Sequence, residues 1–539
     1  MALNRRSHAR LYRCALFCAI AAAHAGMHVA WAQDSRSAYS PGTSTRVSPA
    51  DRANVGRFRK RVEQTLNTPG PDKGLWGVLV ADAATGEIFY ERNADNLFAP
   101  ASNAKLFTTA FALATLGPDY RIRTSIVSSG PIDANGRLAG DLVLIGSGDA
   151  NLSNRKFPYD KKAEREGPPE KALADFADAV AARGVKEISG DIVADDSLFQ
   201  PERFPSGWTV DDMLWAYGAA VSAISVNDNM FTLQLWPGEH EGDFARYDAG
   251  LAAEFYTVEN SVHTSARGTV EKLAVARDPG SPVIRVSGTM PEGGATRKLS
   301  IAVEEPAEYA AKLLARLLEM RGIKIEGRAR ARHAEGPSLD GAPSMQPAIL
   351  AEHTSPPLAD DIVFTNKESE NLHAELLLLL AAHEKSGAAN YEDALKFEST
   401  FFTMAGIGAG DAVLSDGSGL SRKDLVTPRS VVRLLHYAST QPWSELYRTS
   451  LPLAGEDGTL SERMKNTPAA GHVFAKTGTI GHVNSVSGYA ATVRGTKLLF
   501  SILGNNNSLH AQDANRVIDA IIVAMVEELG AVQQETKRK

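Results

Sequence analysis

The stretch FAPASNAKLFTTAFALA, residues 98–114, places a serine and a lysine three positions apart at the start of a strongly apolar segment. The apolar residues after the lysine recur at helical spacing and leave almost no polar face, which predicts a helix buried nearly all round. These apolar residues are Leu106, Phe107, Ala110, Phe111, Leu113 and Ala114.

Ser102 and Lys105 have the spacing that places two side chains on one face of a helix, within reach of each other. A serine hydroxyl is a poor nucleophile unless a base lies beside it. At a helix N-terminus the serine also meets the positive end of the helix dipole, which favours a developing anion. The sequence therefore predicts that Ser102 is a nucleophile and that Lys105 is its base.

Two further short motifs follow in order, Ser369-Glu370-Asn371 and Lys476-Thr477-Gly478-Thr479. The first precedes a predicted helix. There the Ser369 hydroxyl can relay a proton between Lys105 and a leaving amine, and Asn371 can hydrogen-bond Lys105 or the backbone of a substrate.

The second motif lies on a predicted strand. A lysine that acts as a base must be held neutral, which needs burial or a nearby cation, and Lys476 can be that cation. Lys476 can also bind the terminal carboxylate of a peptide, with help from the hydroxyls of Thr477 and Thr479. Gly478 has no side chain, so the strand can approach a substrate closely.

The first two motifs each occur a second time, as Ser153-Asn154-Arg155-Lys156 and Ser225-Val226-Asn227. No apolar helix follows Ser153, and no helix follows Ser225 at once. The lysine motif occurs only once. We therefore expect neither Ser153 nor Ser225 in the active site.

The two ends of the chain predict one α/β domain of the α+β kind, with an antiparallel sheet assembled from both ends and flanked by helices. An early helix carries Val55, Phe58, Val62 and Leu66 on one face, and a last helix carries Val517 to Leu529. The predicted strands are 75–82, 87–92, 473–479, 486–493 and 497–504, and the middle helices are 358–365 and 372–383. We expect this domain to comprise residues 48–116 and 348–530.

Residues 117–347 differ from the two ends of the chain in their sequence pattern, which predicts a large, mainly β insert. Alternating segments such as 121–127, 141–145, 190–193 and 231–235 are punctuated by Gly, Pro and Asn, with helices such as 169–183 between them. The stretch 336–347, rich in Pro, Gly and Ser, predicts the closing linker. An insert of this size exceeds any ordinary loop, so we expect it to fold with its own core, to wall the active site and to restrict which peptides enter.

Residues 1–32 predict a cleaved signal peptide. Four arginines precede the apolar stretch Cys14–Ala23, and Ala30-Trp31-Ala32 is a small-x-small cleavage site before Gln33. Residues 33–47 predict a disordered leader, and residues 531–539 form a charged tail. No later apolar run reaches the roughly 20 residues of a membrane span. We therefore expect a soluble chain, periplasmic or otherwise exported, with no transmembrane anchor after cleavage.

Composition narrows the classes of function. The chain has 57 basic and 64 acidic residues and a formal net charge of -7, which becomes -11 without the signal peptide, so nucleic acid is not an expected partner. Cys14 and Cys18, the only cysteines, both lie in the signal peptide. Disulfides and cysteine-ligated zinc are therefore excluded from the mature chain. We expect no cofactor and no metal.

With its three motifs the chain resembles the class C low-mass penicillin-binding proteins, the D-alanyl-D-alanine carboxypeptidase/endopeptidase family (S13 type). The resemblance includes the segments 416–422, 455–460 and 486–489, and 190–199 and 222–229 within the insert. It extends over nearly the whole mature chain, from about Val55 to Leu529. Glu370 is a departure, since many serine acyl enzymes have Asp at this position.

The resemblance implies a β-lactamase/transpeptidase-like domain and hydrolysis of peptidoglycan stem peptides through an acyl-enzyme on Ser102. It implies an oxyanion hole from the backbone N–H groups of Ser102 and Thr479, and covalent inhibition by β-lactam antibiotics. It also implies that Arg422 and, within the insert, Asp195 contact the stem peptide.

Three other functions stay open at this point: a serine β-lactamase, an esterase and a non-catalytic wall-binding protein. A class A β-lactamase uses a Glu for deacylation. The only E-x-x-x-N after Ser369 is Glu462 to Asn466, close before Lys476. The sequence does not decide between carboxypeptidase and endopeptidase activity, and gives no rates, oligomeric state or protein partners.

Overall fold

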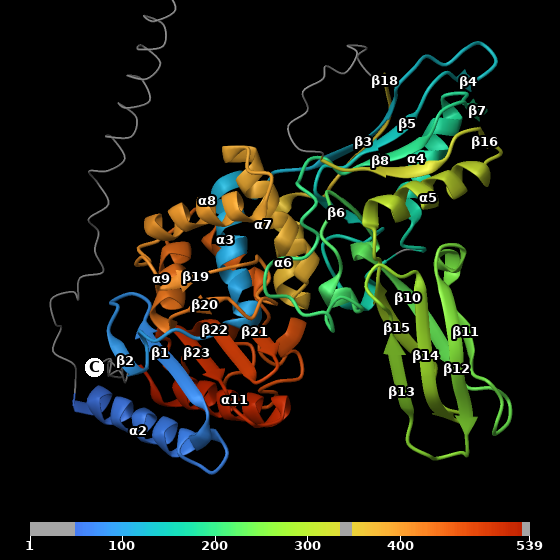
Figure 1. Ribbon diagram of the computed structural model, residues 1–539. Helices are drawn as coiled ribbons and strands as arrows, with labels where there is room; N and C mark the ends of the chain where they lie inside the picture. Colours follow the sequence, from blue (N-terminus) through green and yellow to red (C-terminus); the bar gives the residue numbers. More distant parts are fainter. Residues whose placement is uncertain (1–48, 166, 335–347, 531–539) are drawn as a thin grey trace, which may run out of the picture.

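The computed structural model describes residues 49–165, 167–334 and 348–530. The predicted signal peptide, leader, closing linker and charged tail lie outside these ranges. Figure 1 shows two bodies side by side: the elements from the two ends of the chain, and those formed by the intervening region.

One antiparallel five-stranded sheet, in the order β2-β1-β23-β22-β21, combines strands from both ends of the chain. The predicted sheet is therefore confirmed. Its strands are β1 (Leu75–Asp82), β2 (Ile88–Arg92), β21 (Val473–Ile480), β22 (Val483–Ala491) and β23 (Lys497–Asn505). The pairing of Leu75 with Asn505 sets the register between the two ends.

Alternation along the strands gives this sheet two covered faces. In β1, Val78 and Val80 pack in the core beneath helices α2 (Pro49–Leu66) and α11 (Ala511–Glu528), whereas Leu79 and Ala81 pack in the core formed with the other helices. Those helices are α3 (Ala104–Leu116), α6 (Leu358–Glu368), α7 (Asn371–Ser386), α8 (Tyr391–Met404), α9 (Pro428–Ser439) and α10 (Ser444–Ser450). The short strands β19 (Ala412–Val413) and β20 (Leu425–Val426) pair beside them. Figure 1 shows α3 within this helical layer, above the sheet.

The intervening region contains a second five-stranded sheet, β17-β8-β5-β3-β18, and smaller sheets β16-β7-β4, β11-β10-β15, β12-β14-β13 and β6-β9. Its longer strands are β3 (Arg123–Ser128), β5 (Leu142–Ile145), β6 (Asp149–Leu152), β8 (Ile192–Asp195), β10 (Met230–Trp236), β12 (Thr257–Ser265), β13 (Lys272–Ala276), β14 (Val283–Pro291), β15 (Arg297–Ala302), β17 (Ala329–Arg332) and β18 (Ala348–Thr354). The short ones are β4 (Arg137–Leu138), β7 (Glu187–Ile188), β9 (Ile224–Val226), β11 (Arg246–Asp248) and β16 (Lys324–Ile325).

Two helices, α4 (Lys171–Ala182) and α5 (Pro306–Glu319), complete a separate hydrophobic core in this region. Sequence reasoning named α4 but missed α5, whose Leu313, Leu314 and Leu318 are fully buried in that core. Strand β18 pairs with β3 from Arg123 to Ser128, so the region ends after Thr354 and the predicted boundary at residue 347 is too early.

The region is also built into the rest of the molecule. Ala150, Phe199, Trp208 and Val221 belong to the same hydrophobic core as α3 and α7. The packing therefore holds the region firmly against the helices that carry the three motifs.

Candidate active site

Ser102 lies in a 3-10 turn, Ala101–Asn103, immediately before α3 rather than on its first residue. Ala101 has φ of 47°, an uncommon conformation for a residue with a Cβ. Asn103 donates from Nδ2 to the carbonyl oxygen of Lys476 and to Oγ of Ser485 at 3.2 and 2.8 Å. The turn is thereby fixed against β21 and β22.

Lys105 is fully buried one helical turn beyond Ser102. Its Nζ lies 3.1 Å from Ser102 Oγ, 2.6 Å from Asn371 Oδ1 and 2.8 Å from the carbonyl oxygen of Ser418. A neutral amine has two N–H donors and one lone pair. The amide and carbonyl oxygens can only accept, so they take the two N–H groups and leave the lone pair directed at the Ser102 hydroxyl.

The Ser369-Glu370-Asn371 motif joins α6 to α7. Ser369 adopts the left-handed conformation (φ 64°) that ends α6, and Asn371 is the first residue of α7. Besides accepting from Lys105, Asn371 donates from Nδ2 to the backbone oxygen of Tyr217 in the intervening region at 2.6 Å. The structure therefore brings Ser102, Lys105 and Asn371 together, as the sequence predicts.

Lys476 lies in β21 and is also fully buried. Its Nζ donates to Ser369 Oγ at 2.8 Å and to the backbone oxygen of Thr477 at 2.9 Å. A Cβ at Gly478 would clash with Ser485 Oγ and press on the backbone nitrogen of Ser102, so glycine is needed for the strand to lie against the nucleophile itself. Thr477 Oγ1 hydrogen-bonds Thr459 Oγ1 at 2.7 Å.

The loop at 416–420, quoted from the sequence only for its resemblance, is a structural part of the site. Glu375 of α7 accepts hydrogen bonds from the backbone N–H groups of Gly417 and Ser418 at 2.9 and 2.8 Å. This aims the Ser418 carbonyl at Lys105. A Cβ at Gly419 (φ 81°) would clash with the carbonyl oxygen of Ala101, so the loop can pack against the turn that carries Ser102 only with glycine there.

The two lysines have lowered pKa values. Burial lowers the pKa of Lys105 to about 8, although Asp416, Glu370 and nearby carboxylates raise it. Burial lowers the pKa of Lys476 further, well below its usual range, with Lys105 adding to the effect. The sequence predicts that Lys105 is held neutral and that Lys476 is the nearby cation, whereas burial lowers the pKa of both lysines, and that of Lys476 more strongly. The difference arises because several carboxylates lie near Lys105, whereas only Glu368 raises the pKa of Lys476.

A cleft of about 450 Å³ opens over this arrangement. From the motifs, Ser102, Ser369, Asn371 and Thr479 line it, while Lys105 and Lys476 lie behind its floor. The other lining residues are Asp212, Tyr217, Gly419, Leu420, Arg422, Ile480 and Gly481.

The residues that line the cleft correct the prediction that Asp195 contacts the substrate. Arg422 is exposed in the wall of the cleft, with Nη1 3.5 Å from the Gly481 carbonyl oxygen. Asp195 does not line the cleft: it ends β8 and pairs with Arg332 of β17 at 3.0 Å. The carboxylate that the intervening region does place there is Asp212, held by Thr209 N and Oγ1 at 3.1 and 2.6 Å.

Sequence reasoning missed Asp212 and Tyr217 because no short motif marks them. The segment Thr209–Tyr217 carries no periodicity, and its position over Ser102 depends on the packing of Trp208, whose Nε1 donates to Asp416 Oδ2 at 2.8 Å.

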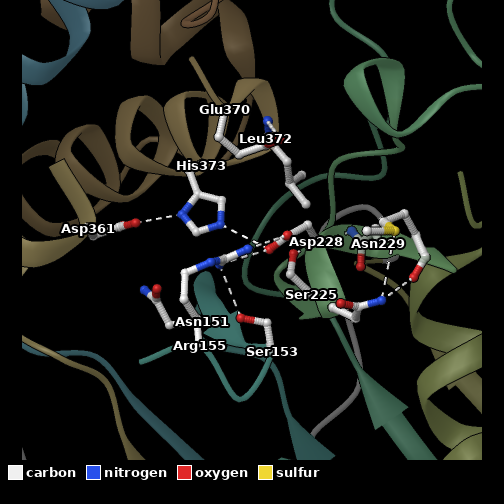
Figure 2. A network of polar contacts seen from close by, with 12 residues as sticks. Asn151, Ser153, Arg155, Ser225, Asp228, Asn229, Asp361, Glu370, Leu372 and His373 are labelled. Carbon is white, nitrogen blue, oxygen red and sulfur yellow. Dashed lines mark hydrogen bonds and ion pairs between the residues drawn. The ribbon is translucent and has the colours of Figure 1, made fainter. Parts of the chain in front are cut away.

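The second copies of the motifs lie together outside the cleft. Ser153 Oγ accepts from Arg155 Nη1 at 3.1 Å, and Ser225 lies beside Asn229, in the network shown in Figure 2. Their predicted exclusion from the active site agrees with this placement.

The described ranges contain no group of three or more His, Cys, Asp or Glu side chains arranged to hold a metal ion. None of their helices combines the length and the apolar character that a bilayer span requires.

Known proteins resemble this chain in both sequence and fold. A model of the D-Ala-D-Ala carboxypeptidase 3 (S13) family matches residues 58–528. A D-alanyl-D-alanine carboxypeptidase of Actinomadura sp. (strain R39) is 34% identical over 510 residues, which cover 92% of this chain and 89% of that protein. The D-alanyl-D-alanine carboxypeptidase DacB of Haemophilus influenzae is 26% identical over 439 residues, covering 80% and 85%.

The crystal structure of penicillin binding protein 4 from Haemophilus influenzae superposes with a TM-score of 0.72 at 25% identity, covering 87% of this chain and 98% of that one. The match extends over the strands, the helical layer and the intervening region alike, so the expected fold is confirmed. The chain belongs to the D-Ala-D-Ala carboxypeptidase 3 (S13) family.

Proposed function

We propose that this enzyme hydrolyses the terminal D-alanyl-D-alanine bond of peptidoglycan stem peptides through an acyl-enzyme on Ser102, and that β-lactam antibiotics acylate the same residue. The observation that carries the proposal is the position of Lys105 Nζ, 3.1 Å from Ser102 Oγ and bound to two further acceptors. Family membership supports the peptidase over the β-lactamase, esterase and wall-binding alternatives.

In the acylation step, neutral Lys105 takes the proton of Ser102 Oγ as the oxygen attacks the carbonyl carbon of the scissile bond. The developing oxyanion lies between the backbone N–H groups of Ser102 and Thr479, which are brought close by the contact of Gly478 with the Ser102 turn. Ser369 Oγ, which faces the cleft and accepts from Lys476, then passes its proton to the nitrogen of the leaving D-alanine as the C–N bond breaks. The proton held by Lys105 replaces it, so Lys105 returns to its neutral form. Water then hydrolyses the acyl ester and regenerates Ser102.

The free carboxylate of the terminal D-alanine binds beside Thr479, with the charge of Lys476 behind Ser369. Because Lys476 is buried and its pKa is well below the usual range, a bound carboxylate favours its protonated form. Thr477 acts indirectly, through its hydrogen bond to Thr459.

The stem peptide's diamino acid carries an amine and a carboxylate, and the cleft offers a partner for each. Arg422 provides the cation for the carboxylate, and Asp212, in place of Asp195, provides the anion for the amine. Peptidoglycan lies outside the cytoplasmic membrane, so we place the mature enzyme in the periplasm or otherwise outside the cell.

Purified muropeptides test the function directly. Incubation with monomeric pentapeptide should release D-alanine, and the same reaction with Ser102→Ala should release none. Cross-linked dimers in a parallel reaction measure endopeptidase activity. Rapid turnover of a penicillin without D-alanine release would instead identify a β-lactamase and contradict the proposal.

A further inference from the structure

His373 lies two residues beyond Asn371 in the first turn of α7 and is fully buried between two carboxylates. Its Nδ1 is 2.5 Å from Asp361 Oδ1, and its Nε2 is 3.2 Å from Asp228 Oδ1. Ionised carboxylates only accept hydrogen bonds, so both ring nitrogens carry protons and the ring is an imidazolium. Burial alone would lower the pKa of His373, but Asp361 and Asp228 raise it to about 9.

The two carboxylates come from different parts of the molecule. Asp361 belongs to α6, next to the motif, whereas Asp228 belongs to the 3-10 turn η5 (Asn227–Asn229) of the intervening region. Asp228 Oδ2 also accepts from Arg155 Nη2 at 2.6 Å and from Arg165 Nη2 at 3.3 Å. Figure 2 shows His373 between Asp361 and the Asp228–Arg155 pair.

Arg155 ties this network to α6 a second time. Its guanidinium carbon lies 3.6 Å from the ring centre of Phe364, and the Phe364 ring is 4.8 Å from that of His373. The Arg155 side chain is 1% exposed, so the pair with Asp228 is shielded from water. The network therefore joins α6, α7 and the intervening region through fixed, oppositely charged groups.

The backbone that presents Asp228 is unusual. Asn227, Asp228 and Asn229 have φ of 51°, 55° and 50°, a left-handed conformation that such residues ordinarily adopt singly. Asn229 Nδ2 donates to the Ala220 carbonyl at 2.8 Å and Asn227 Nδ2 to that of Met230 at 2.7 Å, which holds the turn in place. Three such residues in succession indicate that the placement of Asp228 is enforced by its surroundings.

The same helical turn carries the catalytic contact of Asn371, whose Oδ1 accepts from Lys105 and whose Nδ2 donates to the Tyr217 carbonyl. The intervening region thus contacts the first turn of α7 at two points. The Tyr217 carbonyl accepts a hydrogen bond from Asn371, and Asp228 pairs with His373. Glu370, the residue before Asn371, caps this turn by accepting from Leu372 N at 3.4 Å.

We infer that His373, clamped between Asp361 and Asp228, is a positioning residue that holds Asn371 against Lys105 and so makes acylation of Ser102 depend on the intervening region. The inference rests on the proposed acylation of Ser102. In this role His373 makes no contact with substrate. Its effect is to keep the lone pair of Lys105 aimed at the nucleophile.

The test is the double variant His373→Leu/Asp361→Asn. It removes one positive and one negative charge, leaves Asp228 paired with Arg155, and cuts the link to α7. With a fluorescent penicillin, active-site titration counts the competent sites, and stopped-flow kinetics separates the dissociation constant from the acylation rate constant. We expect the acylation rate constant per competent site to fall about 10- to 100-fold, while the dissociation constant stays within about threefold.

The matched control is Arg321→Leu/Asp178→Asn, which removes an ion pair (2.6 Å) within the intervening region that does not involve α7. It should leave the acylation rate constant unchanged. A merely structural role of His373 predicts fewer competent sites with an unchanged rate constant, and that result overturns the inference.

If the double variant does not fold, Asp228→Asn serves as the second test. It keeps the shape of the side chain and leaves His373 its Asp361 partner. A wild-type acylation rate in folded Asp228→Asn would likewise overturn the inference. Failure of the wild-type protein to be acylated at all would instead contradict the proposed function.

Discussion

At the scale of single residues, the chemistry depends on the protonation states of two lysines that are buried beneath one cleft. Lys105 touches the nucleophile and Lys476 touches Ser369, so each serine hydroxyl has its own lysine. Carboxylates near Lys105 oppose the effect of burial on its pKa, which therefore stays within reach of physiological pH.

Substitution of Lys105 tests its role as the base. Lys105→Ala should lower the rate of penicillin acylation by at least about 100-fold, the usual contribution of a general base. Lys105→Arg should not rescue it, because a guanidinium keeps its charge but cannot give up its proton. Stopped-flow acylation kinetics measures both variants. Acylation of the Arg variant at the wild-type rate would show that Lys105 is not the base.

The pH dependence of acylation follows from the lowered pKa of Lys105, about 8. Only the neutral amine accepts a proton, so at pH 7 roughly one molecule in ten is reactive, and the fraction rises with pH. The acylation rate constant should therefore increase from pH 6 and level off above about pH 9, with a midpoint near 8. A rate that is flat or falls over this range would contradict the assignment.

The sequence is sufficient to find the residues that touch Ser102, because each lies in a short motif with a defined local structure. It is not sufficient to find Asp212. That carboxylate reaches the cleft only through the packing of Trp208 on Asp416, a contact between residues 208 positions apart. Asp195 was easier to identify from the sequence because it ends a predicted strand, but its carboxylate forms an ion pair with Arg332.

At the scale of elements, the turn that carries Ser102 is held between a strand and a loop, each of which approaches through a glycine. Gly478 brings β21 against Ser102 N, and Gly419 brings the loop at 416–420 against Ala101. The five strands of the sheet and helices α2, α3, α6, α7 and α11 were predictable from their periodicity, whereas α8, α9 and α10 were not identified. Helix α5 was missed because the segments around it show strand-like alternation. Strand β18 was assigned to the wrong part of the chain because its partner β3 lies more than 200 residues away in the sequence.

Gly419→Ala tests the loop contact, with Gly410→Ala as its control. Both glycines have nearly the same φ, 81° and 83°, so the left-handed backbone alone should make alanine lower stability by about 1 kcal/mol at each, and the contact at Gly419 adds to that loss. A Cβ at Gly410 has open space, whereas at Gly419 it would meet Ala101. Acylation should slow about tenfold or more in Gly419→Ala only, measured beside thermal unfolding. Equal acylation rates in the two variants would remove the loop from the mechanism.

At the scale of the whole molecule, the intervening region is less separable than its length suggests. It has its own core, yet it also contributes Trp208 and Phe199 to the core around α3 and supplies Tyr217 and Asp212 to the cleft. The sequence predicted a wall that selects peptides. The structure adds contacts to α7, so deletion of the region should impair acylation by a small penicillin as well.

Asp212→Asn separates peptide choice from acylation. Loss of the charge should lower kcat/KM roughly 10- to 100-fold for stem peptides with a free side-chain amine, because a charge-assisted hydrogen bond is lost. Acylation by a penicillin without such an amine should change little. Asp195→Asn, paired with Arg332 away from the cleft, is the control and should behave like wild type. A loss of kcat/KM in Asp195→Asn but not in Asp212→Asn would show that Asp195 is the substrate contact instead.

The most direct test of the central claim is peptide mapping by mass spectrometry after treatment with a penicillin. The account predicts one covalent adduct with the mass of the intact antibiotic, on the peptide that contains Ser102, and no adduct in Ser102→Ala. An adduct on another serine such as Ser153 or Ser225, or one that persists in Ser102→Ala, would contradict it.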